Sequence, residues 1–330
     1  MRALLLQRTG KPYDFEMGTF PVPEPGPNDV RIKIAATACN PIDYKLATHG
    51  NASWTVFPRI LGLDTAGVVD KVGLNVADYH VGDRVVQHGD LRRRGGGYAE
   101  YTVCDTRHLA RIPRTVSYID AAAAMCAGLT AMQAVSRKLH VKAGDTVLIH
   151  GGAGGVGSYA VQLCKVLGAT VMTTCQGEKA DYVRSLGADE AIDYTTEDVS
   201  QRVMELTNGL GADCILNTLS PETGVEDVER LAFNGVLCMI SGPMPVSMAD
   251  LGMFVKGQTL TTCFLGGAHM YQHEESLVDL KKMAEEILDL QAEGSIRSPI
   301  QKIIRLNQVP RALDELEDRH VTGKIIVDMQ

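Results

Sequence analysis

The sequence predicts an α/β fold in which a doubly wound parallel sheet is inserted into a second, mostly antiparallel β domain. Two patterns lead to this prediction. Residues 146–265 alternate short apolar runs with amphipathic helical patterns, which is typical of a parallel sheet covered by helices on both faces. The first 120 residues instead combine short alternating runs with frequent Gly and Pro, which favours antiparallel strands joined by irregular loops.

The region 146–265 contains six predicted strands with helices between them. The strands are expected at Thr146–His150, Ala169–Thr174, Glu190–Ile192, Asp213–Asn217, Gly235–Ile240 and Thr259–Leu265. The helices are expected at Ser158–Leu167 and at about 178–187, 197–207, 222–233 and 248–256. This number of strands suits a complete doubly wound sheet, whose ligands bind across the carboxyl ends of the strands.

The two ends of the chain are expected to form one domain together. Alternating runs near the N-terminus are Arg2–Leu6, Asp29–Ala36, Gly67–Val72, Arg84–His88 and Ala99–Val103. After Gly266 come a long helix at about Glu275–Glu293, ended by Gly294, and strand patterns at Ile300–Leu306 and Gly323–Met329 around a helix at about 307–317. These C-terminal elements are too few to build a core alone, so we expect them to return to the N-terminal domain.

Composition narrows the classes of function. The chain has 330 residues and a formal net charge of −8, without the clustered Lys and Arg that nucleic-acid binding requires. No run reaches the roughly eighteen apolar residues of a membrane span, and we expect a cytoplasmic protein. The eight cysteines include no C-x-x-C pair, and we interpret them as reduced core thiols.

The most informative motif is the glycine-rich turn that follows the first strand of the parallel sheet. Gly152, Gly154 and Gly157 have the G-x-G-x-x-G spacing, with Gly155 and Val156 between them. Such glycines permit a tight turn, a close approach of phosphates to the backbone, and close packing of helix and strand. A helix N-terminus then offers free N–H groups to an anion. The motif alone also fits a purely structural turn, but its strand–turn–helix context predicts dinucleotide binding in a Rossmann domain.

Seven segments, including part of this turn, carry a resemblance to a known family. They are Asn40-Pro41-Ile42-Asp43, Leu61–Val69, Val81–Val85, Gly97–Tyr101, Ala127–Ala131, Ala153–Gly157 and Gly323–Val327. In this order they resemble the medium-chain dehydrogenase/reductase superfamily, and within it the zinc-free NADPH:quinone oxidoreductase-like group. The resemblance covers nearly the whole chain. It implies a GroES-like catalytic domain at 1–122, a Rossmann domain at 123–265 and a return segment at 266–330.

The resemblance also raises the question of zinc, because the superfamily includes zinc alcohol dehydrogenases. Those relatives have Cys at the position of Asn40 and a His-Glu pair at the position of Leu63-Asp64. Cys126 matches a third ligand position, but one thiolate cannot hold the ion, and we interpret it as a core residue. No cysteine lies between residues 87 and 98, where zinc relatives often carry a structural zinc lobe. We therefore expect no metal.

The residues after the second strand of the parallel sheet favour NADPH. NAD-specific sites place an acid there, whereas this chain has Thr174–Gly177. Similar NADPH reductases bind the 2′-phosphate with a Lys and a Tyr that Lys179 and Tyr194 match, although Lys179 also fits a solvated helix lysine. The resemblance further implies cofactor contacts at Thr130, Ser241, Phe264 and Leu265, of which the last three equally fit simple strand ends.

Without zinc, hydrogen-bond donors must stabilise the negative charge that develops on the acceptor oxygen. The family geometry places a loop at Asn40–Lys45 near the nicotinamide. Tyr44 is a candidate proton donor, or equally a packed tyrosine. Asn40 fits an orienting residue, and Asp43 fits a residue that fixes the loop through backbone N–H groups.

The sequence hypothesis is therefore a zinc-independent, NADPH-dependent oxidoreductase. Its acceptor would be a small-molecule quinone or another α,β-unsaturated carbonyl, because reduction of such acceptors delocalises charge. The resemblance also implies a homodimer joined through the sixth strand of the Rossmann sheet. A non-catalytic NADPH-binding scaffold or sensor is the alternative, because a fold does not fix a function.

Overall fold

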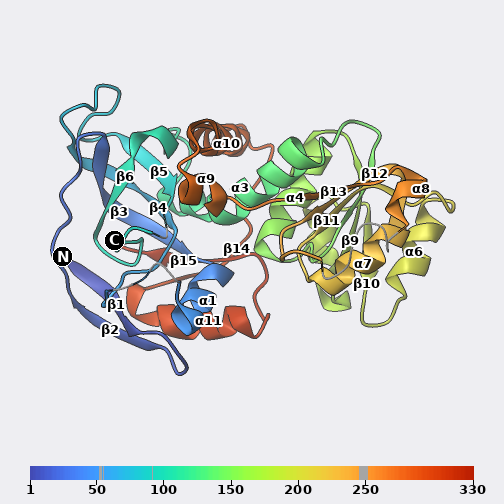
Figure 1. Cartoon of the computed structure of the whole chain (residues 1–330), viewed down its shortest axis with the longest axis horizontal. Helices are drawn as coiled ribbons and strands as arrows, with labels where there is room; N and C mark the ends of the chain where they lie inside the picture. Colours follow the sequence, from blue (N-terminus) through green and yellow to red (C-terminus); the bar gives the residue numbers. More distant parts are fainter. Residues whose placement is uncertain (52–53, 55, 91, 245–251) are drawn as a thin grey trace. The chain divides into compact units, whose positions relative to one another are not determined.

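The computed structural model describes residues 1–51, 54, 56–90, 92–244 and 252–330. The chain forms two compact units (Figure 1). The first unit comprises Met1–Leu129 together with Leu265–Gln330, and the second comprises Thr130–Phe264. The two ends of the chain therefore belong to the same unit, as the sequence predicted.

Within the described residues, the second unit contains a six-stranded parallel sheet with the order β10-β9-β8-β11-β12-β13. Its strands are β8 (Thr146–Ile149), β9 (Thr170–Cys175), β10 (Glu190–Asp193), β11 (Ala212–Asn217), β12 (Leu231–Met239) and β13 (Thr259–Thr262). This is the 3-2-1-4-5-6 order of a Rossmann sheet. The strands remain parallel, but the direction in which successive strands are added reverses between β8 and β11. The six predicted strands are confirmed, but β12 starts earlier than predicted, and β13 ends before Cys263.

Helices connect these strands and cover the sheet (Figure 1). They are α4 (Gly155–Val166), α5 (Ala180–Ser185), α6 (Val199–Leu206), α7 (Pro221–Arg230) and α8 (Met253–Lys256), with η2 (Gln133–Lys138) and η3 (Gly177–Lys179). Residues 248–251 of the predicted helix at 248–256 lie outside the described residues. Leu148, Ile215 and Leu237 are fully buried in one apolar cluster. This cluster packs three neighbouring strands of the sheet together.

The first unit is mostly antiparallel, as predicted. Its seven-stranded sheet has the order β14-β15-β3-β4-β5-β7, with β6 paired to β3, and β1 and β2 form a separate hairpin. The strands are β1 (Arg2–Arg8), β2 (Asp14–Thr19), β3 (Asp29–Cys39), β4 (Asp64–Val72), β5 (Arg84–His88), β6 (Tyr101–Asp105), β7 (Leu109–Arg111), β14 (Ile300–Ile304) and β15 (Lys324–Asp328). The strands β2 and β7 were not predicted.

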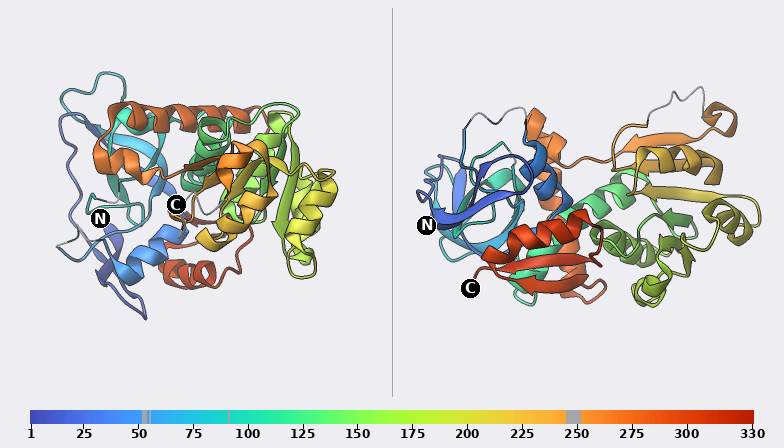
Figure 2. Two further views of the ribbon diagram at one scale, coloured as in Figure 1. Left: turned by 45° about the vertical axis from the view of Figure 1, so that its right-hand side comes forward. Right: turned by 90° about the horizontal axis from the view of Figure 1, so that it is seen from below.

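The C-terminal segment completes this sheet. Strand β15 lies between β14, to which it is parallel, and β3, to which it is antiparallel. Helix α11 (Val309–Glu317), preceded by η4 (Leu306–Gln308), lies beside α1 (Pro41–His49) in both views of Figure 2. Helix α10 (Glu274–Ala292) buries one apolar face that includes Leu277, Leu280 and Ile287. The predicted return of the tail is thus confirmed.

The Asn40–Lys45 segment corrects one expectation, because most of it is helix and not loop. Asn40 is the N-cap of α1, Pro41 occupies the first helical turn, and the Asp43 carboxylate accepts the backbone N–H of Asn40 at 2.9 Å. Proline early in a helix and an acid at its third position are typical start signals. Five further elements were also not predicted: η1 (Thr106–His108), α2 (Tyr118–Ala124), α3 (Cys126–Met132), η2 and α9 (Gly266–Tyr271).

Two global properties follow from the described residues. No single helix among them has the length and hydropathy to cross a membrane; the bent pair Tyr118–Ala124 and Cys126–Lys138, with 51° between its parts, satisfies those criteria only when combined. All eight cysteines are free thiols, and only Cys126 among them is not buried.

Candidate active site and cofactor turn

The three spaced glycines of the turn after β8 differ in what surrounds them. A Cβ at Gly152 would lie 2.1 Å from the Thr173 hydroxyl oxygen, and one at Gly157 would lie 2.2 Å from the Gly151 carbonyl oxygen. A Cβ at Gly154 would meet only the Gly151 carbonyl oxygen, at 3.3 Å. Gly152 and Gly157 are therefore required for packing, whereas Gly154 leaves space above the backbone.

That space lies at the N-terminus of α4. Gly154 is the N-cap, and the helix starts at Gly155. The N–H groups of Gly155, Val156 and Gly157 belong to the first turn, where no helical carbonyl is available to accept them. These donors and the positive end of a twelve-residue helix provide the anion site that a pyrophosphate requires. The turn therefore fits a dinucleotide.

Lys179 and Tyr194 lie on neighbouring loops at the carboxyl edge of the Rossmann sheet. Lys179 follows β9, Tyr194 follows β10, and the paired residues Cys175 and Asp193 end the two strands side by side. The tyrosine is half exposed. The structure thus brings the two predicted 2′-phosphate ligands to one edge, although they are separated in sequence.

Asp193 is a carboxylate at this edge that the sequence analysis overlooked. It accepts hydrogen bonds from Thr195 N at 3.0 Å, Thr195 Oγ1 at 2.7 Å and Thr196 Oγ1 at 3.1 Å. The Thr195 and Thr196 hydrogen bonds lower its pKa. Because its oxygens accept hydrogen bonds from its own loop, Asp193 stabilises the conformation of that loop. Strand β9 itself ends without an acidic residue.

The other predicted cofactor residues are distributed over both units. Ser241 follows β12 at the same sheet edge, and its Oγ is buried without a hydrogen-bond partner among the described residues. Thr130 lies at the start of the second unit, where its carbonyl accepts the Cys263 thiol at 3.6 Å. Phe264 is 63% exposed and ends that unit, whereas Leu265 is buried and begins the return segment.

A buried charge network lies directly beneath the glycine turn. His150 Nε2 contacts the Asp227 carboxylate at 2.7 Å, and Arg230 Nη1 donates to the same carboxylate at 2.9 Å. His150 Nδ1 lies 3.3 Å from Thr174 Oγ1, which accepts the Gly151 N–H at 3.0 Å. Burial alone would raise the pKa of Asp227, but the His150 contact keeps it below its usual value. His150 directly follows β8, one residue beyond the observed end of the predicted strand Thr146–His150, and both of its ring nitrogens have partners.

A second buried network, in the first unit, surrounds Asn40. Its carboxamide Nδ2 donates to the Asp64 carboxylate at 2.8 Å, and its Oδ1 accepts a hydrogen bond from Lys324 Nζ. Lys324 Nζ also donates to the Cys39 carbonyl at 3.0 Å and lies 3.6 Å from Asp64. The second Asp64 oxygen accepts the Cys126 N–H at 2.8 Å. Both ends of the Asn40 amide are therefore engaged, as suits an orienting residue.

Asp43 anchors the start of α1 to two neighbouring segments. Besides the Asn40 N–H, its carboxylate accepts the Gly62 N–H at 3.1 Å and the Tyr98 hydroxyl at 3.0 Å. Asp43 and Tyr98 are completely buried. Burial raises the pKa of Asp43 to about 7, in spite of hydrogen bonds from these three groups that lower it. Asp43 thus holds the helix start in place.

Tyr44 occupies a different environment from Asn40 and Asp43. Its half-buried ring packs against the apolar core that includes Leu46 and Leu313. Burial raises the pKa of the Tyr44 phenol, and its hydroxyl has no hydrogen-bond partner among the described residues. A free hydroxyl on a packed ring is compatible with both roles that the sequence analysis left open.

The residues around Asn40 do not fit a catalytic zinc ion. Such an ion takes three protein ligands from Cys, His and carboxylate side chains. Here the three comparable positions supply the amide of Asn40, the apolar side chain of Leu63 and the single thiol of Cys126, and the neighbouring Asp64 carboxylate is paired with the Lys324 ammonium. Across the described part of the chain, no group of three or more potential ligands is arranged to hold a metal.

Comparison with known proteins agrees with the architecture. Residues 26–114 match the family described as alcohol dehydrogenase GroES-like domain, and residues 155–281 match the family described as zinc-binding dehydrogenase. The two units thus define an oxidoreductase with a GroES-like domain and a Rossmann domain.

Individual relatives narrow the assignment. The quinone oxidoreductase of Pseudomonas aeruginosa is 33% identical over 324 residues, which cover 96% of each protein. The solved quinone oxidoreductase of Pseudomonas syringae is 30% identical, with a TM-score of 0.87 over 99% of each chain. A solved NAD-dependent alcohol dehydrogenase is 29% identical, with a TM-score of 0.88 over the full length of both chains. The chain belongs to the medium-chain dehydrogenase/reductase superfamily, in its quinone oxidoreductase-like group.

Proposed function

We propose that this oxidoreductase is NADPH-dependent and zinc-independent, and that it reduces a quinone or another α,β-unsaturated carbonyl. The observation that carries this proposal is the Lys324–Asp64–Asn40 network. At the positions where zinc relatives hold their metal, an ammonium group already balances the one available carboxylate. A bound nicotinamide would supply the hydride, and acceptors that delocalise charge need no Lewis acid.

The side chains have distinct roles in this proposal. The first turn of α4 binds the pyrophosphate, and Lys179 with Tyr194 binds the 2′-phosphate. Asn40 and Asp43 position the start of α1, because their polar atoms are satisfied within the protein. Tyr44 is the candidate donor of a hydrogen bond or proton to the acceptor, because its hydroxyl is free.

The test is NADPH oxidation with a panel of quinones, enones and aldehydes, measured with and without a chelator. We expect turnover of conjugated acceptors that is unchanged by the chelator, and less than one equivalent of zinc in active protein. Loss of activity with the metal would contradict zinc independence. Tight NADPH binding without turnover of any acceptor would favour the non-catalytic scaffold or sensor.

The Tyr44→Phe variant tests the proposed donor separately. If the hydroxyl assists the acceptor, kcat falls by about 10²-fold while the KM for NADPH stays constant. Tyr13→Phe serves as the control, because the Tyr13 hydroxyl contacts Glu317 on the surface of the same unit. An unchanged kcat would leave Tyr44 as a packing residue.

We further propose a cytoplasmic homodimer in which β13 pairs with its copy in a second chain. The strand lies at the end of the sheet order and pairs only with β12 among the described strands. Light scattering coupled to size-exclusion chromatography should give twice the 35.6 kDa chain mass. A mass of one chain would contradict the dimer.

A further inference from the structure

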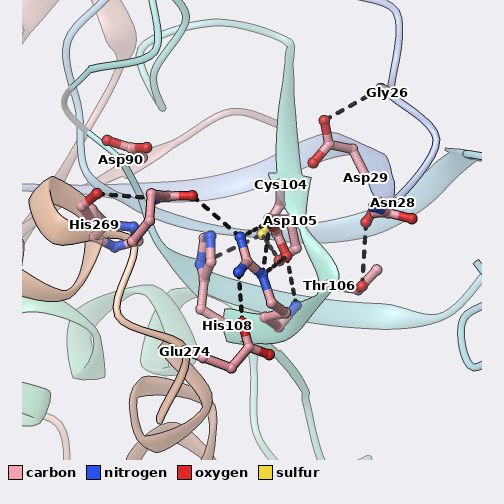
Figure 3. A network of polar contacts seen from close by, with 12 residues as sticks. Gly26, Asn28, Asp29, Asp90, Cys104, Asp105, Thr106, His108, His269 and Glu274 are labelled. Atoms are coloured by element: carbon pink, nitrogen blue, oxygen red, sulfur yellow. Dashed lines mark hydrogen bonds and ion pairs between the residues drawn. The ribbon is translucent and has the colours of Figure 1, made fainter. Parts of the chain in front are cut away.

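A polar cavity of about 250 Å³ lies in the first unit. Its walls come from the loop after β5, from η1 and from the segment that joins α9 to α10 (Figure 3). The lining residues are Asp90, Arg92, Arg93, Asp105, Arg107, His108, His269, Gln272 and Leu277. At roughly 30 Å³ for each water molecule, the volume holds about eight waters or one small organic molecule.

The two carboxylates that line this cavity are already neutralised. Asp90 accepts Arg92 Nε at 3.0 Å and Arg92 Nη2 at 2.7 Å, and Asp105 accepts the same two groups of Arg107 at 3.0 and 2.7 Å. Two-point contacts of this kind pair the charges in a fixed geometry. Neither carboxylate is therefore available as a bare anion that would repel a negatively charged ligand.

The third guanidinium group, that of Arg93, is paired as well, but with a carboxylate outside the cavity lining. Arg93 donates to both oxygens of Asp29, at 3.2 and 2.9 Å, and Asp29 does not line the cavity. Among the described residues, neither Arg93 Nε nor Arg92 Nη1 has a hydrogen-bond partner. One donor nitrogen on each of these two guanidinium groups therefore remains for a ligand.

A buried histidine adds a third unsatisfied group. His269 is 3% exposed and lines the cavity, and its Nε2 has no hydrogen-bond partner among the described residues. Its ring stacks on His88 with 5.7 Å between centroids and meets the edge of His108 at 4.7 Å. Burial lowers the pKa of His269 to about 4, so that the neutral ring carries one N–H. An unpaired buried polar atom destabilises the folded protein, and a ligand that hydrogen-bonds to it would remove that penalty.

We propose that this cavity binds a small oxyanion, a carboxylate or a phosphate, through Arg92 Nη1, Arg93 Nε and His269 Nε2. Oxyanions accept several hydrogen bonds at once and match guanidinium geometry. A metal ion is not favoured, because the described residues contain no group of three or more side chains arranged to hold one. This site is separate from the proposed function, and its test requires no turnover.

Inorganic phosphate and succinate are the two probes, each compared with potassium chloride at matched ionic strength. Calorimetry measures the affinity, and NMR of the histidine ring C–H groups reports the location. We expect saturable binding of at least one probe, with shifts of the His269 and His108 resonances. The probe that binds more tightly distinguishes phosphate from carboxylate chemistry. Absence of saturable binding, or shifts confined to other histidines, would overturn the proposal.

Two variants remove the ligand groups in different ways. The double substitution Asp90→Asn with Arg92→Gln removes one ion pair without changing the net charge, and His269→Asn removes the imidazole. Each should weaken binding by about tenfold or more, since hydrogen bonds to charged groups are stronger than those between neutral groups. Arg114→Gln, an exposed arginine of the same unit, is the control and should not change the affinity. Equal affinity in all three variants would identify an adventitious ion only.

Discussion

The ammonium group of Lys324 lies 3.6 Å from the carboxylate of Asp64, and both side chains are almost completely buried. The two residues come from β15 and β4, which lie on opposite sides of β3 in the sheet. Asn40 follows β3 and bridges them, because its amide contacts both. This pair places a fixed positive charge beside Asn40, and it leads to the first prediction.

Lys324→Met should destabilise the protein strongly. The substitution leaves Asp64 as a buried charge without a cation, and loss of one partner of a buried pair costs about 3–5 kcal/mol. Urea unfolding measures the change in the free energy of unfolding. Lys302→Met is the matched control, because the pair between Lys302 on β14 and Glu315 on α11 is partly exposed and should contribute less than about 1 kcal/mol. Adding Asp64→Asn to Lys324→Met should recover part of the loss; no recovery would show that the charge of Asp64 is not the cause.

Asp43 should make stability decrease as pH rises from about 4 to 7. Burial raises its folded pKa to about 7 from 3.8, so the folded state retains a proton that the unfolded state loses. Its contribution is therefore complete below pH 3.8 and is lost as pH rises toward 7, with a slope of about 1.4 kcal/mol per pH unit.

Asp43→Asn removes this titration, so the free energy of unfolding should depend less steeply on pH than in the wild type. Asp64, whose pKa burial also raises, remains in both proteins, and the difference between them isolates Asp43. Asp181→Asn removes a fully exposed carboxylate and should leave the slope unchanged. Parallel curves for wild type and Asp43→Asn would refute the assignment.

The glycines of the cofactor turn should separate into two classes. Gly157→Ala should destabilise the fold, because its Cβ would lie 2.2 Å from the Gly151 carbonyl. Gly154→Ala should fold normally but bind NADPH at least about tenfold more weakly, because its methyl group fills the space for the phosphates. Thermal unfolding without cofactor and NADPH titration test the two effects. Unchanged NADPH affinity in Gly154→Ala would contradict the proposed phosphate position.

Lys179→Ala should change the choice of cofactor. Loss of one ammonium contact to the 2′-phosphate should raise the KM for NADPH by about tenfold, with little effect on NADH. Arg184→Ala, on the following helix, is the control. Steady-state kinetics with both cofactors provides the measurement. If the KM values for NADPH and NADH change equally, Lys179 does not bind the 2′-phosphate.

The local pattern of apolar residues and glycines in the sequence was sufficient to predict much of the fold. The strands around Leu148 and Ile215 are continuous apolar runs because both faces of the sheet are covered, and the spaced glycines specify the turn by sterics alone. Helix α1 was missed because it has only nine residues and a weak amphipathic pattern, although Pro41 and Asp43 in its first turn are helix start signals. Strand β7 was missed because three residues are too short for a periodic signal.

The sequence by itself determined the six Rossmann strands, the glycine turn and the lack of zinc-ligand side chains at Asn40 and Leu63, because these depend on residues that are close along the chain. Tertiary structure decided that Lys324 meets Asp64 and that His88, His108 and His269 cluster beside three arginines. Asp64 and Lys324 are 260 positions apart in the chain. Contacts of this kind depend on strand pairing and on shared burial, for which no local pattern in the sequence carries a signal.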